Sequence, residues 1–249
     1  ASLNTLKAFK EYKDKGNLLV IATSRSFLPD SMDPSYFDGF IFNNGQYIEF
    51  NQEVLLNNTF STKQIDYLYK LFIQTNAGSS FQGIRGRWVA NENKDIALKH
   101  MVHYGFDASL FDELVKPFKI DDIEASAITA SFLDAKMMKE CELSLPSDWE
   151  IHAYYDPHDL RIDIHLPGIT KGSSCMKLAE ILKIDPLHTY AFGDGVNDIE
   201  MLELVGCGIA MGNAPDNVKR IADDVTDSLS NDGLAKAFKK HFNLDLNIE

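Results

Sequence analysis

The chain has 249 residues, of which 45% are hydrophobic, so it is long enough for one large domain or for a core with an inserted second domain. A formal net charge of −13 at pH 7 argues against nucleic acid and against an anionic membrane as partners, and no apolar stretch is long enough to span a bilayer as a helix. Three scattered cysteines show neither zinc-site nor disulfide spacing, which favours a reduced, cytoplasmic setting.

The start of the chain predicts one helix followed by short strands. An amphipathic pattern runs from Leu3 to a stop at Gly16. The apolar runs at 18–22 and 39–42 are typical of buried parallel strands, and residues 47–56 predict a hairpin. Polar residues follow the two buried runs where the strands should end, and these are Thr23, Ser24, Arg25, Asn44 and Gly45.

Residues 58–167 predict an inserted α+β domain, because helical spacing alternates there with several strand-like runs. Residues 160–166 alternate strictly between apolar and polar side chains, which predicts an antiparallel strand with one buried and one solvated face. Contact with a substrate is the alternative for the polar face, which carries Arg161, Asp163 and His165.

An alternation of strand and helix patterns returns after residue 168 and continues to the end of the chain. We therefore predict an α/β fold, with a doubly wound parallel-sheet (Rossmann-like) core formed by residues 1–57 and 168–249. Residues 58–167 interrupt this core as the α+β insert. Because the carboxyl ends of parallel strands meet at one edge, the polar strand ends of both core segments should lie together.

Residues 193–198 read Gly-Asp-Gly-Val-Asn-Asp and lie between a predicted strand and a predicted helix. The oxygens of Asp194, Asn197 and Asp198 are grouped on this tight loop, and such oxygens suit a hard cation such as Mg²⁺. A cation held at this edge would bind phosphate. The loop therefore predicts a magnesium and phosphate site.

Two further groups of residues can bind phosphate at the same edge. Thr23, Ser24 and Arg25 offer hydroxyl and guanidinium donors. Lys171 offers an ammonium group at a predicted helix start, where backbone amides also point outward. Together with a bound metal, these donors would form a phosphate clamp.

Local structural roles are the alternatives for these residues. Asp194 can be a turn residue, Lys171 can lie on an exposed helix start, and Thr23 can close a strand end. Asn44 and Gly45 suit a turn with positive φ as well as a ligand. The order and spacing of the motifs favour the functional interpretation.

The motifs resemble those of the haloacid dehalogenase-like hydrolases, most closely the Cof-type sugar-phosphate phosphatases with a type-two, subclass B cap. The resemblance covers nearly the whole chain, and one motif departs from the pattern, because Ser24 stands where the family commonly has Gly. The matching segments are Ala22-Thr23-Ser24-Arg25, Asn44-Gly45, Lys171-Gly172, residues 193–198, and residues 208–214, which read Gly-Ile-Ala-Met-Gly-Asn-Ala.

The resemblance implies a Mg²⁺-dependent phosphatase that hydrolyses a small phosphomonoester, first of all a sugar phosphate, through an aspartyl-phosphate intermediate. It implies that residues 58–167 form a cap that selects the substrate. The partner would be a small phosphorylated metabolite, and the chain a monomer or small homo-oligomer. The implied catalytic residues are Lys171, Thr23 and Asp198, the metal ligands Asp194 and Asp198, and the substrate-binding residues Thr23, Ser24, Arg25, Asn44, Gly45, Lys171 and Asn197.

The family's first motif, Asp-x-Asp-Gly-Thr, supplies the nucleophilic aspartate and does not occur in this sequence. We expect it upstream of Ala1. If it is truly absent, the chain would be a non-catalytic phosphate-binding or regulatory protein. A phosphatase for a phosphorylated cofactor, pyridoxal phosphate or flavin mononucleotide, is the alternative enzyme, and phosphomutase chemistry is a weaker one.

Overall fold

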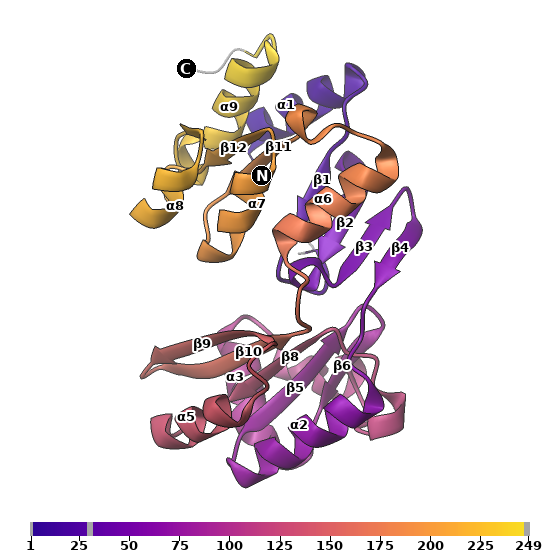
Figure 1. Ribbon diagram of the computed structural model, residues 1–249, viewed down its shortest axis with the longest axis vertical. Helices are drawn as coiled ribbons and strands as arrows, with labels where there is room; N and C mark the ends of the chain where they lie inside the picture. Colours follow the sequence, from indigo (N-terminus) through magenta and orange to yellow (C-terminus); the bar gives the residue numbers. More distant parts are fainter. Residues whose placement is uncertain (1, 29–31, 247–249) are drawn as a thin grey trace. The chain divides into compact units, whose positions relative to one another are not determined.

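The computed structural model describes residues 2–28 and 32–246 of the chain. The chain divides into two compact units, unit 1 (Ala1–Leu56 with Thr170–Glu249) and unit 2 (Asn57–Ile169). In Figure 1 the indigo start and the orange-to-yellow end of the sequence meet in unit 1, and the magenta middle forms unit 2. The division falls close to the expected boundaries, whose assignment to a hydrolase core and a substrate-selecting cap stays a prediction.

The described part of unit 1 contains two separate sheets with helices around them (Figure 1). Its elements are α1 (Leu3–Asp14), β1 (Val20–Ala22), β2 (Gly39–Phe42), β3 (Tyr47–Phe50), β4 (Glu53–Asn57), α6 (Lys171–Leu182), β11 (Tyr190–Gly193), α7 (Ile199–Leu204), β12 (Cys207–Ala210), α8 (Asp216–Ile221), β13 (Asp224–Val225) and α9 (Gly233–Phe242). One sheet has the order β1-β2-β3-β4, in which β1 and β2 are parallel and β2 and β3 antiparallel. The other sheet, β11-β12-β13, is parallel throughout.

Aromatic packing joins the first and last helices of unit 1 to β11. The Ser2 hydroxyl caps α1 by accepting a hydrogen bond from the backbone in its first turn. The ring of Phe9 on α1 lies 5.4 Å from that of Phe238 on α9, measured between centroids. Phe192 of β11 stacks on the same Phe238 ring at 5.3 Å. Chain segments from opposite ends of the sequence therefore share one apolar cluster.

The parallel strands of unit 1 do not form the one continuous sheet that the sequence pattern predicts. Among the described residues, β1 pairs only with β2, and β11 pairs only with β12. The two strands nevertheless border the same apolar clusters, because Ala22 packs against the cluster that contains Ala191, and Leu19, just before β1, packs against the same cluster as Phe192. One edge of β1 and one edge of β11 therefore have no hydrogen-bonded partner strand among the described residues, and no described strand joins the two sheets.

Unit 2 is an α+β domain built on one mixed sheet. Its elements are α2 (Thr62–Gln74), β5 (Gly78–Gly83), β6 (Gly86–Val89), α3 (Lys94–His103), α4 (Phe111–Leu114), β7 (Val115–Lys116), β8 (Ala127–Ser131), α5 (Ala135–Ser144), β9 (Glu150–Asp156) and β10 (Asp159–His165). The strand order is β7-β6-β5-β8-β10-β9, and only β6 and β7 are parallel among the pairings of the described residues. One sheet face carries Phe81, Ile162 and Ile164, each fully buried in the cluster that also contains Phe72 of α2 and Met138 of α5.

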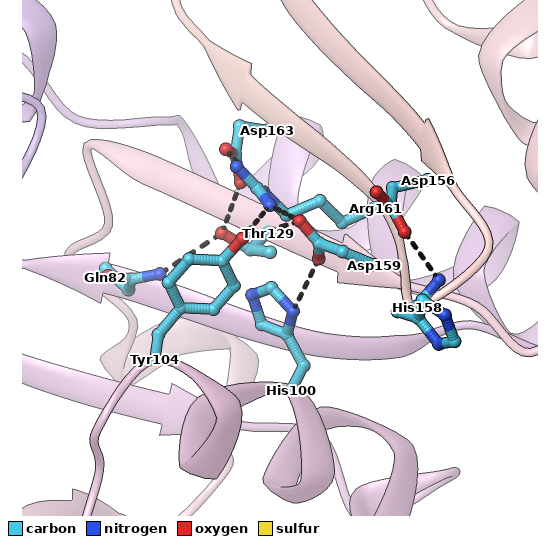
Figure 2. A network of polar contacts seen from close by, with 9 residues as sticks. All are labelled: Gln82, His100, Tyr104, Thr129, Asp156, His158, Asp159, Arg161 and Asp163. Atoms are coloured by element: carbon cyan, nitrogen blue, oxygen red, sulfur yellow. Dashed lines mark hydrogen bonds and ion pairs between the residues drawn. The ribbon is translucent and has the colours of Figure 1, made fainter. Parts of the chain in front are cut away.

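The other face of β10 is not the solvated surface that the alternating pattern predicts. The Arg161 side chain is only 12% exposed and that of Asp163 only 26%. The guanidinium of Arg161 lies 3.6 Å from the ring centroid of Tyr154 and forms ion pairs with Asp159 and Asp163. Figure 2 shows Arg161, Asp159 and Asp163 converging beside His100 of α3. The expectation failed because strand alternation reports which face is polar, and cannot report that neighbouring elements cover that face.

A chain of hydrogen bonds extends this network across the sheet (Figure 2). Gln82 donates to the hydroxyl of Thr129 at 3.3 Å, and that hydroxyl donates to Asp163 at 2.8 Å. His100 of α3 lies 3.4 Å from Asp159, and burial, aided by the nearby Arg161 charge, lowers the pKa of His100 to about 4. The network therefore holds α3 against the sheet. None of the helices in the described parts of either unit is long and apolar enough to cross a membrane.

Candidate functional site

The acidic loop of unit 1 is folded around the side chain of Asp198. β11 ends at Gly193, and a single 3-10 turn at 196–198 leads into α7. One carboxylate oxygen of Asp198 accepts hydrogen bonds from the backbone N–H groups of Asp194 and Gly195 at 3.0 and 2.9 Å. A Cβ on Gly193 would lie 2.6 Å from the Cβ of Asp198, so this position requires glycine. The loop conformation therefore depends on Asp198, while Asp194 stays exposed.

Lys171 and Asp198 form a buried ion pair. The Lys171 Nζ atom lies 2.6 Å from the other carboxylate oxygen of Asp198, and each side chain is only 8% exposed. Lys171 is the first residue of α6, which begins in a capping box formed by Thr170 and Ser173. The sequence predicted this helix start, and the fold places the ammonium group beside the acidic loop. An ammonium group paired with a buried carboxylate is held in one position, as an anion-binding group requires.

The turn after β2 reaches the same place. Asn44 has φ +52°, and Gly45 has φ +103°, where a Cβ would lie 2.3 Å from the carbonyl oxygen of Thr170. The Ser174 hydroxyl donates to the Gly45 carbonyl at 2.8 Å, and the Asn197 amide donates to the Asn44 side chain at 3.2 Å. The turn role of this segment is therefore clear from its geometry, and a ligand role for Asn44 and Gly45 stays a prediction.

Thr23, Ser24 and Arg25 form a turn at the end of β1. The Thr23 backbone joins the turn after β2, since Asn44 N–H donates to the Thr23 carbonyl at 3.1 Å. The Thr23 hydroxyl accepts a hydrogen bond from Arg25 N–H at 3.2 Å, so it closes the strand end. Ser24 and Arg25 are exposed, and the Arg25 guanidinium has no ion pair with any described residue. Their proposed contact with substrate is untested by this geometry.

One contact was not predicted from the sequence, although Asn213 belongs to the Gly-Asn-Ala part of a matched motif. The Asn213 amide donates to a carboxylate oxygen of Asp194 at 2.9 Å. The match of residues 208–214 to a family motif indicated a role for this segment. Only the fold shows that its Asn213 side chain contacts the carboxylate of Asp194.

The donor set suits a hard cation in part. Asp194 offers an exposed carboxylate, whereas both oxygens of Asp198 are engaged by Lys171 and the loop backbone. The described residues contain no group of three or more His, Cys, Asp or Glu side chains that could hold a metal ion. Asp194 therefore fits Mg²⁺ as one oxygen ligand, and further oxygens must come from other groups. This geometry gives no support to Asp198 as a direct ligand.

Comparison with known proteins finds relatives along most of the chain. A family model described as haloacid dehalogenase-like hydrolase matches residues 1–238. The Bacillus subtilis protein named "Putative phosphatase YkrA" is 30% identical over 252 residues, covering 95% of this chain and 89% of that protein. The 5-amino-6-(5-phospho-D-ribitylamino)uracil phosphatase YcsE of the same organism is 29% identical, covering 94% of this chain and 85% of its own.

Solved structures share the fold along the same length. The subclass IIB sugar phosphatase BT4131 is 27% identical with a TM-score of 0.76, covering 97% of this chain and 92% of its own. A hypothetical protein of Geobacillus kaustophilus is 25% identical with a TM-score of 0.83, and the match covers 98% of this chain and 92% of that protein. TM0651 of Thermotoga maritima, at 17% identity and a TM-score of 0.80, shows the fold alone.

These findings confirm the predicted fold class, an α/β core of the Rossmann-like kind with an inserted second domain. They also confirm the resemblance on which the functional expectations rest, since the family match and the phosphatase relatives cover most of the chain. The chain belongs to the haloacid dehalogenase-like hydrolases and is a Cof-type phosphatase.

Proposed function

We propose that this phosphatase hydrolyses a small phosphorylated metabolite, a sugar phosphate first of all, with the help of Mg²⁺. The buried pair of Lys171 and Asp198 beside the exposed carboxylate of Asp194 is the observation that carries the proposal. It combines a fixed cation, suited to phosphoryl oxygens, with an anion suited to a hard metal ion. When bound, Mg²⁺ would neutralise charge on the phosphate.

The residues of unit 1 take distinct parts in this proposal. Lys171 binds phosphoryl oxygens and stabilises the charge that grows on them in the transition state. Asp198 positions Lys171 and the loop, and this explains why its carboxylate is buried. The Thr23 hydroxyl donates to the transferring group, and Asn197 faces the phosphate or the remainder of the substrate. Asp194 holds the metal ion.

We infer that the nucleophilic aspartate lies on a strand upstream of residue 1. Support comes from one edge of β1 and one edge of β11 that pair with no described strand, since both strands belong to one unit and border shared apolar clusters. A parallel strand paired with both edges would end beside Thr23 and Asp194. A carboxylate at that end would reach the phosphate that these residues bind.

The reaction then proceeds in two balanced steps. One carboxylate oxygen attacks phosphorus, the bond from phosphorus to the substrate oxygen breaks, and a second carboxyl group gives its proton to the departing alcohol. That second carboxylate next takes a proton from water, whose oxygen attacks phosphorus as the bond from phosphorus to the nucleophilic carboxylate oxygen breaks. Inorganic phosphate leaves, and both aspartates return to their starting states.

A phosphorylated precursor or form of a flavin cofactor is the second candidate substrate, because YcsE bears the name of a phosphatase for a ribitylaminouracil phosphate. Pyridoxal phosphate stays an alternative within the same class. The oligomeric state and the cytoplasmic setting stay predictions that the site geometry does not address.

Phosphate release by the full-length protein tests the proposal. We expect Mg²⁺-dependent release from at least one member of a panel of sugar phosphates, flavin mononucleotide and pyridoxal phosphate. Asp194→Asn should weaken metal activation, and Lys171→Met should lower kcat by about 100-fold or more because a transition-state contact is lost. Turnover unaffected by both changes would refute the site. Full-length protein that binds phosphate and turns over no substrate would favour the non-catalytic alternative.

A further inference from the structure

We propose that Asn213 is a positioning residue that holds the carboxylate of Asp194 for its cation. This inference rests on the proposed function, since it takes Asp194 as the metal ligand. The Asn213 Nδ2 atom lies 2.9 Å from Asp194 Oδ2, across 19 positions of sequence. The contact arises because the chain after β12 continues beside the end of β11, with Met211 N–H donating to the Gly193 carbonyl at 2.9 Å.

Two hydrogen-bond partners fix the orientation of the Asn213 amide, because both require the nitrogen on the Asp194 side and the oxygen on the Leu229 side. The backbone N–H of Leu229 can only donate, and it lies 3.3 Å from Asn213 Oδ1. The carboxylate of Asp194 can only accept, and it lies against Nδ2. An amide flipped by 180° would lose both hydrogen bonds. Asn213 therefore bridges the acidic loop to the backbone of the loop that follows β13.

The base of this bridge is held firmly. Gly212 N–H donates to the Asp227 carbonyl at 3.1 Å, and a Cβ on Gly212 would lie 2.6 Å from the Ser228 nitrogen. Ala214, on the other side of Asn213, is only 4% exposed. The Asn213 side chain therefore projects from a segment that is packed on both sides, and can fix the carboxylate that it touches.

The residue type suits this role. A lysine or arginine would also orient Asp194, but its positive charge would compete with the metal ion for the carboxylate. The neutral amide orients one oxygen, keeps the full negative charge and leaves the other oxygen for the cation. Such hydrogen bonds to ligating carboxylates are a general means of tuning metal sites.

Metal affinity measured directly on the full-length protein tests the inference. We compare the wild type, Asn213→Ala and the control Asn217→Ala, which removes an exposed amide on α8 four residues away. Mn²⁺ binding followed by electron paramagnetic resonance should weaken about tenfold in Asn213→Ala. It should stay within about twofold in Asn217→Ala, and both variants should melt at the wild-type temperature because the changed side chains are exposed.

Equal metal affinity in all three proteins, or an equal loss in both variants, would overturn the role of Asn213. A matching fall in melting temperature would show a structural effect and would also overturn it. Failure of the proposed function would look different, since the wild type would then bind Mn²⁺ at Asp194 and release no phosphate from any substrate.

Discussion

Replacing Lys171 with methionine should destabilise unit 1 and leave unit 2 unaffected. Methionine nearly keeps the length of the side chain and removes the charge that lies 2.6 Å from Asp198. Both side chains are 8% exposed, so the Asp198 carboxylate would lose its counter-charge in a place that water hardly reaches. Loss of one partner of a buried pair costs 3–5 kcal/mol, and the two backbone N–H bonds that Asp198 keeps favour the lower end, about 3 kcal/mol.

The chain offers a matched control on the same helix. Lys177 pairs with Glu180 at 2.8 Å, but these side chains are 53% and 71% exposed. Lys177→Met should therefore change the free energy of unfolding by less than about 0.5 kcal/mol. Any general effect of methionine on α6 would appear in this variant as well.

Two spectroscopic signals separate the units. Both tryptophans, Trp88 and Trp149, lie in unit 2, so their fluorescence reports the unfolding of unit 2 alone. Circular dichroism reports the unfolding of both units. Lys171→Met should lower the melting temperature of unit 1, whose transition appears in circular dichroism and not in tryptophan fluorescence, by roughly 10 °C. The double variant Lys171→Met with Asp198→Asn should be less destabilised than the sum of the single changes.

Two outcomes would refute this reasoning. A shift in Lys171→Met no larger than that in Lys177→Met would mean that the buried pair contributes little to stability. Additive effects in the double variant would mean that the two side chains do not interact in solution as their distance implies.

Three further predictions concern single positions. Gly45→Ala should cost unit 1 about 2 kcal/mol or more, because φ is +103° and the new Cβ would meet the Thr170 carbonyl at 2.3 Å, whereas Gly16→Ala, at φ +84° with no atom within 4 Å, should cost only about 1 kcal/mol in thermal melts. Ser174→Ala should cost about 1 kcal/mol through the lost bond to the Gly45 carbonyl, and a cost near zero in urea titrations would contradict this. The pKa of His100 is about 4 in the folded chain and near 6.5 in the unfolded chain, so between these pH values only the unfolded chain binds the proton. Unit 2 should therefore lose stability as pH falls from about 6.5 to 4. The variant His100→Gln should lose less stability over this pH range in tryptophan-monitored unfolding.

Local sequence patterns were sufficient to predict most of the helices and strands and the order of the motifs. The strand of residues 160–166 was predicted from its alternation, and Ile162 and Ile164 are indeed fully buried. The loop at 193–198 and the helix start at Lys171 were predicted from glycines, apolar runs and capping residues that act within a few positions. These signals are local, because backbone conformation and helix caps depend on near neighbours along the chain.

The partners of the site residues were decided only by the tertiary structure. Lys171 meets Asp198 across 27 positions and Asn213 meets Asp194 across 19, and no periodicity encodes either distance. The same limit made the polar face of β10 look solvated, although the rings of Tyr154 and of Tyr104, the residue after α3, enclose Arg161. A sequence thus determines which chemical groups are present and which face of an element carries them. Which groups touch, and which lose water, depends on how separate elements pack, and that is settled only by the fold.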